Sequence, residues 1–216
     1  ADILPGTPLF CMGQHQSIQQ VEAEHVTPVP DGLAPPEAVL ARLMGVSMTT
    51  LMTTKARPGD IVLITGTGPV GFLCAHLFRI SGYDVHIADP DRNRQRIARG
   101  SGIENVSALV SEMSGIQNRV ALAIDCSGNE QAVVEGARAI RKGGEVVLVG
   151  VPWNQRTDLT AHELLHVVFH KYAVLRTGWE WELPLHASPF QPHSILDNFR
   201  LALRWLAEGR IPSEGL

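Results

Sequence analysis

Three histidines and a glutamate at regular spacing are the residues of this sequence that most directly suggest chemistry. In the segment HELLHVVFH, His162, Glu163 and His166 form the pattern H-E-x-x-H, and His170 follows one helical turn later. On a helix this spacing places two imidazoles on one face, where both can bind one zinc ion with the glutamate beside them as a general base. The segment therefore raises the hypothesis of a zinc metallopeptidase.

The surrounding sequence disfavours that hypothesis. The longer peptidase pattern has a glycine between its second and third histidines, and none stands between His166 and His170. The same helix carries apolar residues that we expect to pack on a sheet, with the histidines on the other, partly solvated side. These apolar residues are Leu164, Leu165, Val168 and Phe169.

A glycine-rich segment, GTGPVG, has a spacing typical of phosphate binding. It follows an apolar run expected to be a strand (60–66) and opens an expected helix (69–82). The first glycine allows a tight turn, the second lets the backbone approach a pyrophosphate, and the third lets the helix pack on the strand. Free N–H groups at the start of the helix then bind the phosphate. The predicted loop residues are Gly66, Thr67, Gly68, Pro69, Val70 and Gly71.

An acidic residue, Asp89, ends the next expected strand (84–89). A carboxylate there accepts hydrogen bonds from a ribose diol and repels a 2′-phosphate, so NAD is favoured over NADP. Asp91 strengthens this preference, whereas Arg92 and Arg94 weaken it. Two alternatives stay open: the loop as an ordinary strand-to-helix turn of another α/β protein, and Asp89 as a helix N-cap.

Expected strands and helices alternate along most of the chain. The strands are nearly continuous apolar runs, which is typical of a parallel sheet covered on both faces. We therefore predict an α/β fold: a Rossmann-type doubly wound parallel sheet with a small β-rich N-terminal remnant. The expected strands are 60–66, 84–89, 105–110, 120–128, 145–150 and 173–179, and the expected helices are 36–54, 69–82, 90–100, 129–144, 159–172 and 194–209.

Composition changes near residue 36. Residues 1–35 are rich in Pro, Gly, Gln and His and are expected to form short strands and turns, whereas 36–216 are expected to form the nucleotide-binding domain. The net charge is −4 without a Lys/Arg cluster, which disfavours nucleic acid as a partner. No apolar run is long enough for a membrane, and no signal peptide is recognisable. The three cysteines form no C-x-x-C pair, so a cytoplasmic setting is expected.

Several segments, in order, resemble one family. RPGDIVLITGTGPVGFLCAHLF, AIDCSGNEQAVVEGARAIRKGGEVVLVGVP and NFRLALRWLAEGRI look like the nucleotide-binding domain of the medium-chain dehydrogenase/reductases, the zinc-type alcohol dehydrogenase superfamily. The resemblance implies that the glycine loop binds the pyrophosphate and that Asp89 and Arg94 hold the adenosine ribose. It also implies that two turns lie near the nicotinamide, with residues Ser127, Gly128, Val149, Gly150 and Val151.

The resemblance further implies an NAD-dependent oxidoreductase acting on a small alcohol, polyol or carbonyl compound, with a homodimer through the Rossmann-type domain possible. Residues 1–35 resemble the last strands of the family's GroES-like catalytic domain. We therefore expect the chain to be part of a longer dehydrogenase, inactive alone and without catalytic residues of its own. A non-catalytic NAD-binding module is the alternative. A methyltransferase fits the strand pattern less well.

One position departs from the family's pattern. In zinc-dependent members, a Cys, Glu or Asp on the helix before the nucleotide domain completes the metal site, and counting back from Gly66 places it at about residue 42. Arg42 stands there, and a guanidinium cannot bind zinc. Residues 38–54 contain no Cys, His, Asp or Glu. We expect Arg42 to pair with a carboxylate and no zinc in this chain, so the intact enzyme either works without catalytic zinc or binds it through other ligands.

Overall fold

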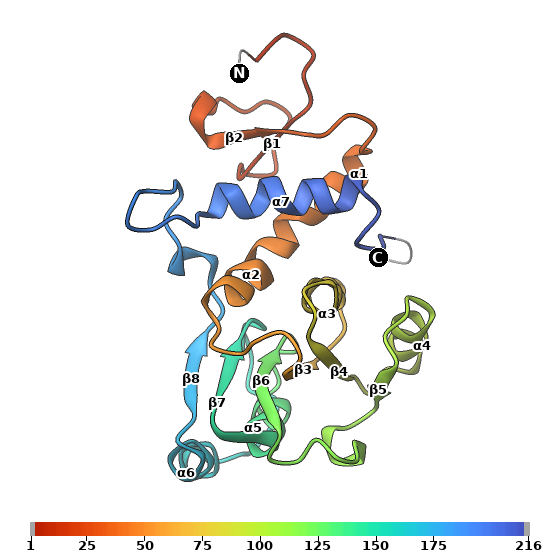
Figure 1. The fold of residues 1–216 in the computed structure, drawn as a ribbon, viewed down its shortest axis with the longest axis vertical. Coiled ribbons are helices and arrows are strands. Elements are labelled where there is room, and N and C mark those ends of the chain that lie inside the picture. The colour runs from red at the N-terminus through yellow and green to blue at the C-terminus, as the bar shows by residue number, and fades with distance from the viewer. Residues whose placement is uncertain (1–2, 214–216) are drawn as a thin grey trace.

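A parallel six-stranded sheet forms the centre of the computed structural model, which describes residues 3–213 (Figure 1). Its strand order is β5-β4-β3-β6-β7-β8, and every neighbouring pair is parallel. The order reverses between β3 and β6, so the predicted doubly wound fold is confirmed. The strands are β3 (Ile61–Thr65), β4 (Asp84–Ala88), β5 (Asn105–Ser107), β6 (Val120–Asp125), β7 (Ile140–Leu148) and β8 (Val174–Thr177).

Helices cover both faces of this sheet. Alternate residues of β3 enter different apolar clusters: Val62 and Ile64 pack with α3 (Pro69–Ile80) and α4 (Arg92–Gly100), and Leu63 packs on the opposite face with α5 (Glu130–Ala139). α6 (Ala161–Lys171) lies on the same face as α5 (Figure 1). Because successive strand residues point to opposite faces, a strand buried on both sides is expected to be nearly continuously apolar, as β3 is from Ile61 to Ile64.

A third apolar cluster lies beside the sheet, where α2 (Leu40–Thr53) packs against α7 (Ile195–Ala207) (Figure 1). Strands β1 (Leu9–Cys11) and β2 (Val26–Pro28) pair antiparallel and join this cluster through Phe10, whose ring centroid lies 5.0 Å from that of Phe199. The small β-rich N-terminal part is therefore present. The domain boundary at residue 36 stays a prediction.

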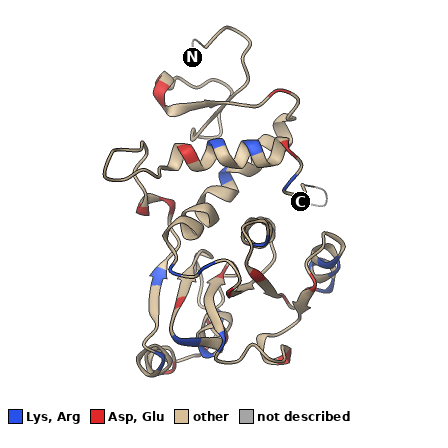
Figure 2. Cartoon of the chain, in the orientation of Figure 1, with Lys and Arg blue, Asp and Glu red and all other residues tan. Residues whose placement is uncertain are grey.

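The remaining elements are short. They are α1 (Pro35–Ala38) and the 3₁₀ turns η1 (Ala23–His25), η2 (Val110–Glu112) and η3 (Glu180–Glu182). Between residues 3 and 213, no helix has both the length and the apolar character needed to cross a bilayer. Acidic and basic residues are interspersed along the chain, with arginines gathered on α4 (Figure 2).

Two expected strands, 105–110 and 120–128, end earlier than predicted, at Ser107 and Asp125, and two expected helices have wrong boundaries. The helix predicted over 36–54 is divided, because Val39 separates α1 from α2. The helix predicted over 129–144 ends at Ala139, and β7 begins at once instead of at residue 145. The pairing of β6 with β7 shifts between Val120 and Leu122, and Gly143, inside β7, has φ +74°, which glycine adopts readily. The beginning of β7 is therefore irregular, and Gly143 and Gly144 lie within the shifted stretch between Ile140 and Glu145.

Candidate functional site

A cavity of about 590 Å³ lies at the carboxyl ends of β3, β4 and β6. This is the point where the strand order reverses, which is where open α/β sheets bind their ligands. The volume is within the usual range for small-molecule sites. Five of the residues predicted from the sequence line it: Gly66, Gly68, Asp89, Arg94 and Ser127.

The three glycines of the loop have different physical roles. Gly66 has φ +82°, and a Cβ there would lie 2.8 Å from the Cβ of Ser127. A Cβ on Gly71 would lie 1.9 Å from the carbonyl oxygen of Gly66, so both positions exclude side chains for packing reasons. A Cβ on Gly68 would meet nothing within 4 Å, and Gly68 borders the cavity as the N-cap of α3. The loop thus leaves open space at a helix N-terminus, which fits a pyrophosphate.

Asp89 is almost completely buried at the cavity wall, with 1% exposure. Its Oδ2 accepts hydrogen bonds from the backbone N–H (2.6 Å) and the hydroxyl (2.8 Å) of Thr67, and its Oδ1 accepts one from the N–H of Asp91 (2.8 Å). A carboxylate has about four acceptor positions, so Oδ1 retains capacity for one more donor. Asp89 therefore orders the glycine loop and can accept a ribose hydroxyl.

Asp91, and not Asp89, caps helix α4. Its carboxylate accepts the backbone N–H groups of Asn93 (2.7 Å) and Arg94 (3.0 Å), so the N-cap alternative for Asp89 is wrong. The N–H groups of Arg94 and Asn93 lower the pKa of Asp91. The guanidinium of Arg94 lies 3.7 Å from Oδ2 of Asp89, at the cavity. One positive and one negative group thus lie together at the cavity, at the position predicted to bind the adenosine ribose.

Asp125 positions several residues of the candidate site, and the sequence analysis missed it. Its buried Oδ1 accepts hydrogen bonds from the hydroxyls of Thr65 (2.8 Å) and Ser127 (2.6 Å) and from the N–H of Ser127 (3.1 Å), and its Oδ2 accepts the N–H of Gly128 (2.9 Å). Its carbonyl oxygen accepts the N–H groups of Val149 and Gly150. Asp125 thus holds both turns that were predicted to lie near the nicotinamide. The sequence feature that could have identified it is an acidic residue at the end of an otherwise apolar strand.

The two turns touch backbone to backbone. A Cβ on Gly150 would lie 2.3 Å from the nitrogen of Gly128, and Gly128 itself has φ +65°. Both glycines border a second cavity of about 230 Å³ beside α5 and α6. Val149 is half-buried and Val151 is exposed, and neither lines one of these two cavities.

The other loop residues have mostly structural surroundings. Thr67 is buried beside Asp89, and Pro69, Val70 and Gly71 form the first turn of α3 without lining the cavity. Cys126 lies at the cavity floor, where the neighbouring Cys74 thiol and burial raise the pKa of the Cys126 thiol. This thiol is therefore held in its protonated form.

The histidine helix does not form a peptidase centre. Glu163 accepts hydrogen bonds from the N–H (3.0 Å) and the hydroxyl (3.4 Å) of Thr160 and so caps α6. The rings of His162, His166 and His170 form an exposed ladder with centroid distances of 5.8 Å and 4.3 Å. In the described part of the chain, no carboxylate or thiol completes a three-ligand cluster with them.

Only two of the four apolar residues of α6 that we expected to pack on the sheet do so. Leu164 and Val168 are half-buried as expected, but Leu165 and Phe169 are 63% and 75% exposed. β8 is the last strand of the sheet, so α6 covers only β7 and the sheet edge, and a wide apolar helix face extends beyond it. The homodimer expected through this domain stays a prediction.

Arg42 forms a bidentate ion pair with Glu180, at 2.5 Å and 2.6 Å. The Glu180 side chain is 2% exposed, and the pair joins α2 to η3. The expected pairing of Arg42 with a carboxylate is therefore present. A buried carboxylate neutralised by a guanidinium leaves no ligand on this helix for zinc, so the residues here do not fit the family's metal.

The comparisons with known proteins agree with this geometry. A family model described as glucose dehydrogenase C-terminus matches residues 33–177. The chain belongs to this family. The predicted membership of the medium-chain dehydrogenase/reductases is thereby confirmed.

Two curated relatives and one solved structure illustrate how far the similarity of this family member extends. L-threonine 3-dehydrogenase of Legionella pneumophila (strain Corby) is 26% identical over 212 residues, covering 87% of the chain and 60% of the relative. L-galactonate-5-dehydrogenase of Escherichia coli (strain K12) is 30% identical over 129 residues, covering 56% and 38%. Galactitol-1-phosphate dehydrogenase from Escherichia coli shares the fold with a TM-score of 0.72 at 19% identity, covering 91% of the chain and 56% of that structure. The chain thus spans about half the length of these proteins.

The Asp125 network generates a prediction. Asp125→Ala removes the acceptor of four hydrogen bonds and leaves buried donors unpaired, so we expect the free energy of unfolding to fall by about 2–4 kcal/mol. Urea denaturation measures it, with Asp158→Ala, which removes an exposed carboxylate, as the matched control. Equal stability of the two variants would contradict the role assigned to Asp125.

Proposed function

We propose that this domain binds a nicotinamide dinucleotide and that the protein to which it belongs transfers a hydride between NAD and the carbon of a small alcohol or polyol. The main support for this proposal is the glycine loop. It lies at the N-terminus of α3 and borders the cavity at the point where the strand order reverses. The relatives' names, which are those of dehydrogenases of threonine and of a sugar acid, support the reaction class.

The bound nicotinamide would supply the hydride chemistry, and the chain's residues bind and orient it. The open side of Gly68 and the N–H groups of the first turn of α3 receive the pyrophosphate. Asp89 accepts the adenosine ribose hydroxyls, with Arg94 beside it. The turns fixed by Asp125, at Gly128 and Gly150, bound the other half of the site.

We further propose NAD as the preferred cofactor. Oδ1 of Asp89 has one free acceptor position, whereas a 2′-phosphate would place negative charge against a buried carboxylate. Arg94 lies within 3.7 Å of that carboxylate and offsets part of the repulsion. The preference therefore rests on Asp89.

The reaction itself is tested on the full-length protein. We expect NADH absorbance to appear when NAD is supplied with alcohol or polyol substrates, because the domain orients NAD for hydride transfer. Tight NADH binding without turnover on a broad substrate panel would favour the non-catalytic NAD-binding module instead.

Gly68→Ala tests the loop while leaving the fold intact. Gly68 has φ −60° and ψ 180°, which alanine also adopts, and the added methyl group meets no protein atom. We expect unchanged stability and at least a roughly tenfold loss of NADH affinity, because the methyl group occupies phosphate space; this corresponds to about 1.4 kcal/mol. Fluorescence titration measures the affinity, and Gly100→Ala, an equally open position, is the control. Wild-type affinity in a folded Gly68→Ala variant would refute the loop assignment.

Asp89→Ala tests the cofactor preference. The wild type should bind NADH more tightly than NADPH. Loss of the carboxylate should weaken NADH binding by about 1–3 kcal/mol, so the affinities for NADH and NADPH should become more similar. Thr67→Val removes one hydrogen bond to Asp89 but keeps the carboxylate, so it should change both affinities together. Tighter binding of NADPH by the wild type would show the NAD assignment to be wrong.

A further inference from the structure

Three side chains with metal-binding chemistry meet where the N-terminal hairpin contacts the segment after η3. They are Glu24 and His25, from η1, and His186. One carboxylate oxygen and one nitrogen of each imidazole lie within 4.8 Å of one another. In the part of the chain that the structure describes, no other group of three such side chains meets this closely.

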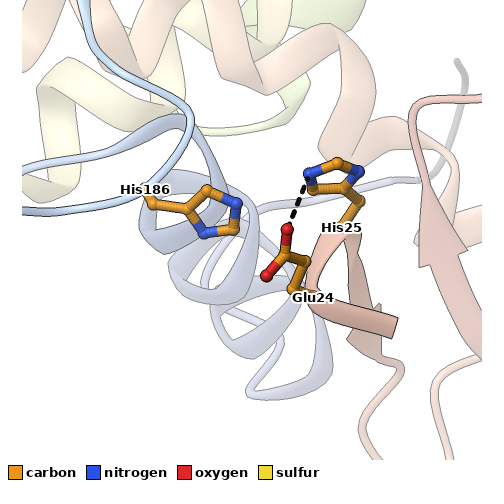
Figure 3. A group of neighbouring side chains, drawn as sticks. All are labelled: Glu24, His25 and His186. Carbon is orange, nitrogen blue, oxygen red and sulfur yellow. Dashed lines mark ion pairs between the residues drawn. The ribbon is translucent and has the colours of Figure 1, made fainter. Parts of the chain in front are cut away.

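The arrangement is convergent. Figure 3 shows the Glu24 carboxylate between the two imidazoles, and the ring centroids of His25 and His186 lie 5.5 Å apart. Oε1 of Glu24 and Nε2 of His25 are 3.6 Å apart, which is too long for a good hydrogen bond. Among residues 3–213, the imidazole of His186 has no hydrogen-bond partner. The three side chains therefore lie close together without forming good hydrogen bonds to one another.

The donor set matches a zinc ion. Two imidazole nitrogens and one carboxylate oxygen, with water in the fourth position, form a common tetrahedral zinc set with bonds of about 2.0–2.2 Å. Such bonds bring the donor atoms to about 3.3 Å from one another. The Glu24 and His25 side chains are 73% and 39% exposed, so small side-chain rotations close the remaining gap.

The backbone beneath the cluster is already held by apolar packing. Phe10 of the hairpin and Leu183 of the other segment are both buried in the cluster formed with α2 and α7. The hairpin and the segment at His186 are thus brought together before any metal binds, which lowers the entropic cost of assembling the ligands.

We propose that Glu24, His25 and His186 bind a divalent transition-metal ion of the zinc class, which clips the N-terminal hairpin to the segment following η3. Its binding free energy adds to the stability of the folded chain, because the unfolded chain does not hold the three ligands together. This site is independent of the cofactor cavity and of the proposed reaction.

The histidine ladder on α6 is the competing location for zinc. His166 and His170 lie 4.3 Å apart between ring centroids and are exposed, so they also offer two imidazoles. The ladder lacks a carboxylate, because Glu163 is bound to Thr160. The test must therefore separate the two places.

The experiment is a calorimetric titration of Zn²⁺ into the purified 216-residue chain without a polyhistidine tag, together with thermal unfolding. We expect one equivalent of zinc to bind and to raise the melting temperature. His186→Ala and Glu24→Gln should each weaken binding by more than about 100-fold, the upper end of what the loss of an outer-shell partner costs. His166→Ala, the matched control, should bind zinc as the wild type does. Circular dichroism establishes that each variant is folded.

Three results would overturn the proposal. They are the absence of stoichiometric zinc binding, wild-type binding by His186→Ala, and loss of binding in His166→Ala, which would put the metal on α6. Zinc binding without a rise in melting temperature would refute the clip between the two segments.

Discussion

The carboxylate of Asp125 is the interaction on which the arrangement of the site depends. It is buried at the end of β6, where leaving a charged group without hydrogen bonds costs several kcal/mol. Its side chain gathers Thr65, Ser127 and Gly128, and its carbonyl oxygen gathers the turn after β7. One residue therefore fixes the ends of β3, β6 and β7 relative to one another, and the cavity borders two of these ends, those of β3 and β6.

Two other buried carboxylates work in the same way. Asp89 binds the glycine loop at the end of β4. Glu145, in β7, accepts hydrogen bonds from the N–H of Lys55 (2.5 Å) and the hydroxyl of Thr54 (3.1 Å) and pairs with Arg176 of β8 at 3.3 Å, which ties the end of α2 to the sheet. In each case a charge that is unfavourable in an apolar interior is stabilised only when several chain segments meet around it. The buried acidic residues thus stabilise one particular arrangement of the loops at the ends of the apolar strands.

The sequence predicted what depends on local patterns. Continuous apolar strands, alternating helices and the glycine spacing predicted the doubly wound sheet, the loop and Asp89, and the family resemblance added Arg94; both residues lie at the cavity. It did not predict the role of Asp125, because its partners come from three strands that only the folded sheet brings together. The same holds for Glu24, His25 and His186, whose proximity depends on tertiary packing. The end of α5 was misplaced because the helical pattern of the sequence continues past Ala139 and the shift in the pairing of β7 with β6 is not visible in that pattern.

The exposure of Leu165 and Phe169 to solvent was also missed, because nothing in the local sequence marks β8 as an edge strand.

The position of β3 at the middle of the sheet also has a consequence for how the chain matures on the ribosome. β3 pairs with β4 soon after both leave the exit tunnel, but its other edge pairs with residues 122–125, which are synthesised much later. Until then that edge is bare and strongly apolar, in a topology whose non-local pairing closes slowly. The half-made chain therefore carries an unpaired strand edge during this interval, and the glycine loop lacks the contact of Gly66 with Ser127 until β6 has been made.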